Sequence, residues 1–535
     1  MKLFNNFMEE YLELNPLHAT YIGINDYNNK LINYTDNREK NKYKKFLKKY
    51  LGLVKKELKK KTITKKNRHY LDVLKYRIEI DLEDYKYDFD YLPINSLHNS
   101  ILNWVEYCTG EGVIKLKTIQ DFSDFIDRIS VYLDIIDGMI EEMKLGIKSG
   151  VSHPKIVMEK VVIDLEKVLK NKNYLLPKIK IPKLIEEDYN LYIGELFPLK
   201  IKRLINYLKK EYIPKTHEGF GLKSIKGGDN MYNYLVRKKT TLKNPNIPDI
   251  HNLGLTEVKR INENINKLCK RFPNLIDVRK SKKKELFFET EEEIFNEFKK
   301  LRTEINNNIM PKYFNMDLDV NIKYDIKKIP DFKAGNNTGA YYLRSSYDRK
   351  RKGTFYINTS KPNEMLKCNS FSLAIHEGNP GHHYQTNFSN DMKNPLFISY
   401  YNDETSFVEG WGLYAEYLGR QHLLEKKNLT EKEAYYLFGS YNFEMLRAVR
   451  LVVDTGIHYY NWDYNKCHQY MSKNTELGEK ELENEIYRYS LYPGQALAYK
   501  IGGLKFKKMK EETNKDIKTF HYDLLRFGAS PLWML

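Results

Sequence analysis

The chain has 535 residues, of which 41% are hydrophobic and 30% are charged, and this composition predicts a soluble, folded protein with a sizeable core. No apolar run approaches the ~18–20 residues that a membrane-spanning helix needs. Glu9 and Glu10 lie where a signal peptide would need an unbroken apolar stretch. We therefore expect a cytoplasmic protein without a transmembrane segment.

The formal net charge of +18 raises nucleic acid and anionic membrane surfaces as partners. The excess is lysine, scattered through helical sequence such as residues 40–67, and we found no RNP pattern, zinc finger or glycine-rich phosphate loop. We interpret the lysines as solvated helix faces and do not expect nucleic acid as a partner. The four cysteines form no C-x-x-C pair, which is typical of a reducing compartment rather than of a disulfide scaffold.

Apolar residues at helical spacing predict a series of helices in the first half of the chain. A connection rich in proline and lysine follows at 173–187, and a loop leads into a further helix for which Thr256 is a plausible N-cap. The predicted helical segments are 7–16, which stops at Pro16, then 43–60, 122–150, 151–171 and 188–240. Residues 243–268 begin as the loop and end as the further helix.

The sequence changes character near residue 318. Residues 319–332 and 339–360 alternate and are rich in Tyr, Ile, Val and Thr, so they predict strands with turns, whereas the chain after 360 is helical in pattern. The predicted fold class is therefore mainly α, a single large helical body over 1–535 with a small β element. It has a helical N-terminal half over 1–317, and the sheet and the helices with the histidine motif lie in 318–535.

The segment FSLAIHEGNPGHHYQ, residues 371–385, holds three histidines within eight residues. A zinc hydrolase needs about three protein ligands, an open position for water and a carboxylate that takes the proton of that water. In the pattern H-E-x-x-H, two histidines one helical turn apart face the same ion and the glutamate lies beside it. His376 and Glu377 match the first half of that pattern.

The second histidine is either His382 or His383, six or seven residues after His376. Seven residues of straight helix advance ~10 Å, which is too far for two imidazoles that share one ion at ~2.1 Å each. The helix must therefore be broken or compacted at Pro380 and Gly381, where proline removes a backbone hydrogen bond and glycine accepts unusual torsions. We prefer His382 as the ligand and keep His383 as the alternative.

The third ligand is expected on a following helix in TSFVEGWGLYAEYLG, residues 405–419. Glu409 and Glu416 are seven residues apart on one face, and Gly410 and Gly412 would permit a close approach of another helix. We predict Glu409 as the ligand and Glu416 as a hydrogen-bond partner of a ligating histidine. Alternatively, the histidines cap a helix and Glu409 is an ordinary surface acid.

Five segments occur in the same order as in a known family: HEGNPGHHYQ, SFVEGWGLYAEYLG, LRAVRLVVDTGIHYYNWD, YPGQALAYKIG and the tail FHYDLLRFGASPLWML. On these segments the sequence resembles the DUF885 family of predicted zinc metallopeptidases. The resemblance spans nearly the whole chain. It implies a mostly helical fold like that of helical zinc oligopeptidases and carboxypeptidases. It also implies that His376, one or both of His382 and His383, and Glu409 hold one Zn²⁺, with Glu377 as the base.

Arg447, Arg450, Asp454 and His458 share one face of an otherwise apolar helix. Such a stripe must be paired or must line a wet cavity, so one interpretation is a buried Arg–Asp network. For Arg450 and His458 we favour contact with the substrate or with the developing oxyanion.

Tyr492 and Tyr499 lie beside a Pro-Gly turn and are candidate oxyanion donors, with Tyr492 preferred, although most of the 43 tyrosines must serve packing. Residues 353–360 form either an exposed strand edge that pairs with a peptide or part of a core hairpin. The nearby Arg344, Arg349 and Arg351 could bind a substrate carboxylate, but ordinary solvated charges are favoured.

Together these features predict a zinc-dependent peptidase that acts on short peptides, with water activated by Glu377. Two alternatives remain at this point. The same ligands would serve a zinc hydrolase of an ester or a non-peptide amide. A basic binding or scaffold protein with a vestigial metal site belongs to a different class.

Overall fold

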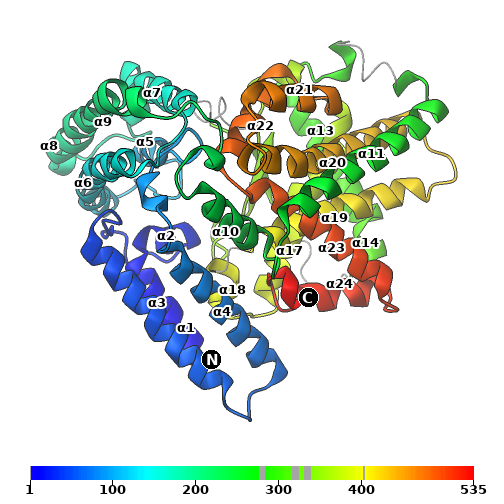
Figure 1. The fold of residues 1–535 in the computed structure, drawn as a ribbon, viewed down its shortest axis with the longest axis horizontal. Coiled ribbons are helices and arrows are strands. Elements are labelled where there is room, and N and C mark those ends of the chain that lie inside the picture. The colour runs from blue at the N-terminus through cyan, green and yellow to red at the C-terminus, as the bar shows by residue number, and fades with distance from the viewer. Residues whose placement is uncertain (1, 276–283, 316–323, 331–338, 402–403) are drawn as a thin grey trace. The chain divides into compact units, whose positions relative to one another are not determined.

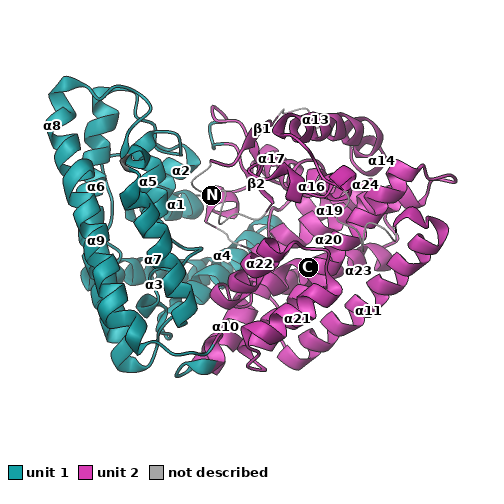
Figure 2. Cartoon of the chain, turned by 90° about the horizontal axis from the view of Figure 1, so that it is seen from above, with its two compact units in different colours: residues 1–219, 224–227, 346–348 teal, residues 220–223, 228–345, 349–535 magenta. Residues whose placement is uncertain are grey.

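A computed structural model describes residues 2–275, 284–315, 324–330, 339–401 and 404–535. The described chain is mainly helical with one small sheet (Figure 1), so the predicted fold class is confirmed. Contacts within the chain divide it into two compact units (Figure 2), the first being residues 1–219, 224–227 and 346–348 and the second residues 220–223, 228–345 and 349–535. Each of the two units is described below by itself.

The first unit is helical, and its longest helix, α6, shows why. Thr118 and Asp121 form a reciprocal capping box at its start, and Gly150 ends it in the left-handed conformation at φ 76°. The helices of this unit are α1 (Lys2–Leu14), α2 (Pro16–Ile22), α3 (Asn37–Leu58), α4 (Lys65–Asp84), α5 (Ser100–Thr109), α6 (Ile119–Ser149), α7 (Lys155–Lys170), α8 (Glu186–Tyr189) and α9 (Phe197–Tyr207), the last flanked by π-helical turns at Asn190–Leu196 and Leu208–Tyr212.

The second unit contains the histidine motif and the helices around it. Its longest helix is α20, which begins with a capping box between Thr430 and Glu433 and is buried over most of its length. The helices are α10 (Gly228–Thr240), α11 (Ile247–Arg271), α13 (Glu291–Asn308), α14 (Met310–Tyr313), α16 (Ser370–Glu377), α17 (His382–Asp391), α18 (Leu396–Tyr400), α19 (Thr405–Leu424), α20 (Glu431–His458), α21 (Tyr464–Asn474), α22 (Glu479–Leu491), α23 (Gln495–Glu512) and α24 (Ile517–Leu525).

Two helix pairs hold the second unit together, α19 against α23 and α11 against α20. The first pair is unusually close because glycine meets glycine: a Cβ at Gly410 would lie 2.5 Å from Gly502 Cα. The expectation that glycines beside Glu409 admit another helix is therefore confirmed at Gly410. The short helix α16 lies among α13, α19, α20 and strand β2 (Ala340–Leu343).

The small sheet has the order β1-β3-β2, with β1 at Asp325–Lys328 and β3 at Thr354–Ile357. Strand β1 pairs with β3 in parallel and β2 pairs with β3 antiparallel, so that Tyr342 lies opposite Phe355. Because β3 is the central strand and Phe355 and Ile357 are buried, the exposed edge considered at residues 353–360 is wrong. Strand β2, next to α16, is an edge strand of this sheet instead.

Two further expectations concern the start of α11 and the change of character near residue 318. Helix α11 begins after Asn246, whose side chain accepts a hydrogen bond from Asp249 N, with Pro248 in the first turn, so Thr256 is not an N-cap. Its hydroxyl instead donates to Asn252 O within the helix. The change of character at residue 318 falls outside the described residues, and β1 follows it inside the second unit.

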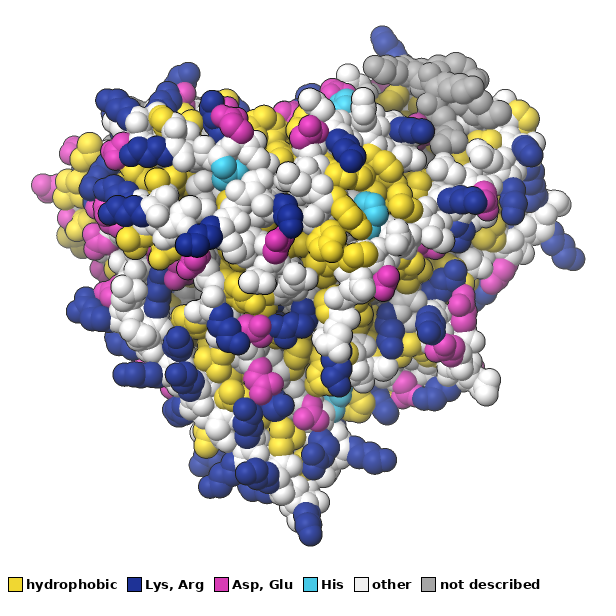
Figure 3. Space-filling view, viewed as in Figure 1, with side chains coloured by type: hydrophobic (Ala, Val, Ile, Leu, Met, Phe, Trp, Pro, Cys, Tyr) yellow, Lys and Arg dark blue, Asp and Glu magenta, His cyan; other side chains and the backbone are white. Residues whose placement is uncertain are grey.

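On the face shown in Figure 3, Lys and Arg side chains are spread over the molecule with Asp and Glu side chains among them. All four cysteines are buried thiols rather than halves of disulfides. Across the described ranges, no helix combines the length and the apolar character needed to cross a membrane.

Candidate metal centre

The helix that carries the histidine motif is broken at the predicted step. Helix α16 ends at Glu377 and α17 begins at His382. Between them the chain folds back on the end of α16, because Gly381 N donates to Ile375 O at 3.0 Å. A Cβ on Gly381 would lie 2.0 Å from His376 O, so only glycine fits this turn. The distortion is a break between two helices rather than a bulge within one.

A tryptophan fixes this turn against the next helix. Trp411 of α19 donates its indole N–H to Pro380 O at 2.8 Å and is completely buried. The backbone path that sets the direction of His382 is therefore tied to the helix that carries Glu409 and Glu416. The short connection and the α19 helix thus form one packed assembly.

The break brings His376, His382 and Glu409 together. Their ligand atoms lie within 4.8 Å of one another, and they form the single cluster of metal-ligating side chains found across the described residues. Glu409 Oε2 lies 3.4 Å from His376 Nε2 and 3.5 Å from His382 Nε2. Ligands at ~2.0–2.1 Å from a tetrahedral Zn²⁺ are separated by roughly 3.4 Å, so these spacings match such a donor set.

The unpartnered atoms of the cluster also suit a cation. Glu409 Oε2 is buried and accepts no hydrogen bond of ordinary geometry, although a buried carboxylate oxygen normally has a donor. Two imidazole nitrogens and one carboxylate oxygen are the donors typical of zinc sites. The residues present therefore fit the ion that the sequence predicts.

Electrostatics at the cluster favour positive charge. Burial by itself would raise the pKa of Glu409, but the two adjacent imidazoles lower it well below its usual range. Burial would lower the pKa of His376, yet Glu409 and Glu416 raise it to about 9. Because the carboxylates stabilise a charged imidazole to this degree, they would also attract a metal cation.

Glu416 orients His376 from the opposite side. His376 Nδ1 donates to Glu416 Oε1 at 2.7 Å, which leaves Nε2 to face Glu409. Arg447 Nη2 lies 3.4 Å from the same Glu416 oxygen. The imidazole fits because α19 has a glycine beneath it: a Cβ at Gly412 would lie 2.5 Å from His376 Cε1.

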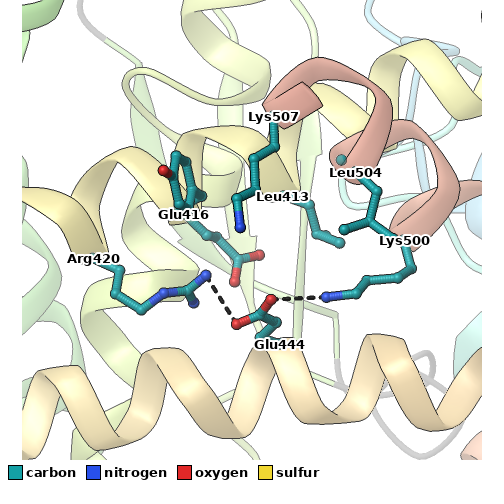
Figure 4. Close-up of a pocket in the computed structure, with 9 residues that line it drawn as sticks. Leu413, Glu416, Arg420, Glu444, Lys500, Leu504 and Lys507 are labelled. Carbon is teal, nitrogen blue, oxygen red and sulfur yellow. Dashed lines mark hydrogen bonds and ion pairs between the residues drawn. The ribbon is translucent and has the colours of Figure 1, made fainter. Parts of the chain in front are cut away.

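Behind Glu416 is a small cavity of about 30 Å³, enough for an ordered water molecule. Arg420 of α19 and Lys500 of α23 point toward Glu444 of α20 (Figure 4), with N–O distances of 2.9 and 2.8 Å. Burial would raise the pKa of Glu444, but these cations lower it. This buried network joins the three helices that surround Glu416.

Glu377 and His383, which flank the ligands in the sequence, have different surroundings. Glu377 is buried at the end of α16, and no hydrogen bond joins its carboxylate to another described residue. His383 turns to other partners, since its Nδ1 lies 2.9 Å from Tyr342 Oη and 3.2 Å from Asn387 Nδ2. The structure therefore brings His382 rather than His383 to the cluster.

The charged stripe on α20 is buried and paired, but not as an Arg–Asp network. Arg450 binds the carboxylate of Glu485 at 2.8 and 3.1 Å. Asp454 accepts from Tyr232 Oη at 2.6 Å and from Gly494 N at 3.1 Å, and burial raises its pKa to about 7.

The two ring nitrogens of His458 are both occupied by backbone groups. Nδ1 accepts from Leu222 N at 3.0 Å, and Nε2 donates to Tyr489 O at 2.8 Å. Burial lowers the pKa of this histidine to about 4. The structure does not bring His458 to the candidate ligands, and its hydrogen bonds are those of a core residue.

Of the two candidate tyrosines, Tyr499 is the one that lies against the ligands. Its ring is nearly parallel to that of His376, with centroids 6.5 Å apart. Burial and then the charge of Glu409 raise its pKa. Tyr492 ends up just after α22, and burial likewise raises its pKa. The sequence analysis missed Arg488 and Trp411, although the i, i+3 spacing of Glu485 and Arg488 could have indicated the former.

The three arginines near the sheet are occupied. Arg349 pairs with Asp391, Arg344 donates to Ser399 O, and Arg351 donates to Arg344 O at 3.0 Å. Arg349 is exposed, as expected of a solvated charge, whereas Arg344 and Arg351 are only partly exposed and donate to backbone carbonyls.

Fold and donor set together define a mainly helical protein with a candidate divalent-metal centre of two histidines and one glutamate. The chain belongs to the DUF885 family, described as bacterial protein of unknown function, whose model matches residues 16–535. It is similar to a solved protein from Colwellia psychrerythraea described as a putative lipoprotein, with 19% identity, a TM-score of 0.86 and coverage of 99% of this chain and 96% of that chain.

A second solved protein, from Shewanella oneidensis and described as a putative lipoprotein of unknown function, gives 15% identity and a TM-score of 0.72 over 99% of this chain and 97% of that chain. At these identities the likeness shows the fold alone. No curated protein matches the sequence.

Proposed function

We propose that this protein is a zinc-dependent peptidase that hydrolyses short peptides. The observation that carries the proposal is the convergence of His376, His382 and Glu409 beside the buried Glu377. Zn²⁺ held by these three residues would act as a Lewis acid toward the scissile carbonyl and would acidify water. The choice of a peptide among carbonyl substrates rests on the helical fold and on the family resemblance.

The chain's own residues supply the proton transfer. The carboxylate of Glu377 takes a proton from the water as the water oxygen forms a bond to the carbonyl carbon, and it delivers that proton to the leaving amine nitrogen as the amide C–N bond breaks. Glu416 keeps Nδ1 of His376 protonated and so keeps Nε2 available as a donor atom. Strand β2 is an edge strand of the described sheet next to α16, and an extended peptide that paired with it would add main-chain hydrogen bonds.

The test begins with elemental analysis of the purified protein, for which we expect one zinc per chain. A peptide library and an ester panel are then assayed with the wild type and Glu377→Gln. We expect peptide hydrolysis that falls at least ~100-fold in Glu377→Gln while the zinc content is unchanged. Glu512→Gln on an exposed helix face is the matched control.

Absence of stoichiometric zinc, or full activity of Glu377→Gln, would reject the proposal. Hydrolysis of esters without peptides would replace it by the alternative hydrolase. The cytoplasmic location and the absence of a nucleic-acid partner stay predictions of the sequence.

A further inference from the structure

Beside the candidate metal centre, one buried carboxylate is shared by two guanidinium groups. Glu485 Oε2 accepts from Arg450 at 2.8 and 3.1 Å, and Glu485 Oε1 accepts from Arg488 at 3.3 Å. Both guanidinium groups thus bind the same carboxylate. This cluster of Arg450, Arg488 and Glu485 therefore has one positive charge in excess, and an uncompensated buried charge is costly unless an anion pairs with it.

The excess charge lies one side chain away from the candidate ligands. Arg450 lies over the ring of Tyr499 at 4.7 Å, and Arg488 Nη2 donates to the Tyr499 hydroxyl at 2.9 Å. The ring of Tyr499 is also nearly parallel to that of His376, at a centroid distance of 6.5 Å. Tyr499 thus connects the charged cluster to the metal centre.

Arg488 is the arginine that is available to a ligand. Its side chain is 24% exposed, whereas that of Arg450 is 5% exposed. Among the described residues, Arg488 donates to Glu485, to Gln495 Oε1 at 3.1 Å and to Tyr499. A guanidinium has five N–H groups, so two remain. Gln495 and Tyr499 hold the group in place, which lowers the entropy cost of binding.

We propose that Arg488 binds the C-terminal carboxylate of the peptide substrate, so that the enzyme is a carboxypeptidase-type exopeptidase. This inference rests on the proposed peptidase function. A planar guanidinium recognises a carboxylate through paired, charge-assisted hydrogen bonds, whereas the N-terminal ammonium of a peptide would be repelled by the same excess charge.

The geometry also limits the length of the released fragment. The contacts through Tyr499 put Arg488 Nη2 within about 12 Å of the His376 ring, a span that an extended chain crosses in about three residues at ~3.5 Å each. We expect release of at most about three residues from the C-terminus. An endopeptidase would have no need of a fixed cation at this distance.

Binding is tested on the zinc-loaded Glu377→Gln protein, which holds peptides without cleaving them. The probes are N-acetyl-tetraalanine with a free carboxylate and the same peptide as its C-terminal amide, both measured by calorimetry. We expect the acid to bind at least 10-fold more tightly than the amide. Adding Arg488→Gln should abolish this preference, and Arg488→Lys should retain part of it because the charge remains but the paired geometry does not.

The same two peptides are then given to the wild-type protein, with Arg38→Gln, an exposed arginine, as control. Cleavage of the acid with release of short C-terminal fragments, and a rise in KM for Arg488→Gln, supports the inference. Equal binding of acid and amide, or a preference that persists in Arg488→Gln, overturns it. If the acid binds preferentially through Arg488 but nothing is cleaved, the carboxylate site stands and the peptidase proposal fails. Melting temperature and zinc content identify a variant that has lost its fold.

Discussion

Replacing Gly412 by alanine tests whether the candidate centre depends on the exact position of His376. The new Cβ would lie 2.5 Å from His376 Cε1 and 2.9 Å from Nε2, whereas ordinary contacts begin at 3.4 Å. The imidazole must therefore move by about 0.9 Å, several times the ~0.2 Å tolerance of a metal–ligand distance. The atoms that clash belong to a side chain and not to the backbone, so α19 itself should persist.

The displaced ring also loses its 2.7 Å hydrogen bond to Glu416, and loss of such a partner alone weakens metal binding 10–100-fold. We expect Gly412→Ala to bind zinc at least ~100-fold more weakly, about 2.8 kcal/mol. Competition with a chromophoric chelator measures this affinity. The control is Gly52→Ala, since a Cβ at Gly52 meets nothing within 4 Å. Undiminished zinc affinity in a folded Gly412→Ala protein would refute the placement of His376 at the ion.

Two further outcomes are expected. Glu416→Gln should weaken zinc binding ~10–100-fold because the neutral amide polarises the ligating imidazole less, and chelator competition that shows wild-type affinity would contradict the role of this carboxylate. The buried His153, His458 and His521 each have a pKa lowered by burial to about 4. They stay neutral in the fold while the unfolded chain takes up protons below pH ~6.5, so stability is lost as the pH falls, by about 2 kcal/mol for each residue at pH 5 relative to pH 8. Because the raised pKa of Asp454 opposes this trend, the measurement compares the change in melting temperature between pH 8 and pH 5 in the wild type and in His521→Gln. An equal change in both proteins would show that His521 is not buried as described.

Helical spacing was sufficient to predict that the motif helix breaks, but not which histidine turns inward. The advance of a straight helix makes His376 and either later histidine too distant, and Pro380 and Gly381 mark the step. The choice of His382 depends on the backbone path of the turn. Hydrogen bonds to Ile375 O and from Trp411 fix that path, and the second comes from 31 residues away.

Sequence spacing was also insufficient to predict the partners of the polar face of α20. Periodicity correctly put Arg447, Arg450, Asp454 and His458 on one face, because a helical repeat determines which side chains share a direction. It does not determine what lies opposite. The partners of Arg447 and Arg450 are Glu416 and Glu485 on other helices, so the role expected for Arg450 at the oxyanion has no support in its contacts.

Composition predicted strands in the right segment but not their order. Residues 319–332 and 339–360 each contribute to the sheet, yet β3 pairs with both other strands and becomes central. Strand order depends on pairing between segments that are distant in the sequence, which local composition does not determine. The N-cap of α11 shows a local version of the same problem, since Asn246 and Thr256 are both suitable residue types and Pro248 in the first turn decides in favour of the former.

The His376 ring lies between two carboxylates, Glu409 and Glu416, that belong to one helix. Sliding or rotating α19 relative to α16 would break the contacts of both imidazole nitrogens at once. If the protein is the proposed hydrolase, these two helices would therefore behave as one rigid block. Any motion that admits a peptide would then have to arise in segments that carry neither carboxylate, such as the edge strand β2 or the beginning of α23.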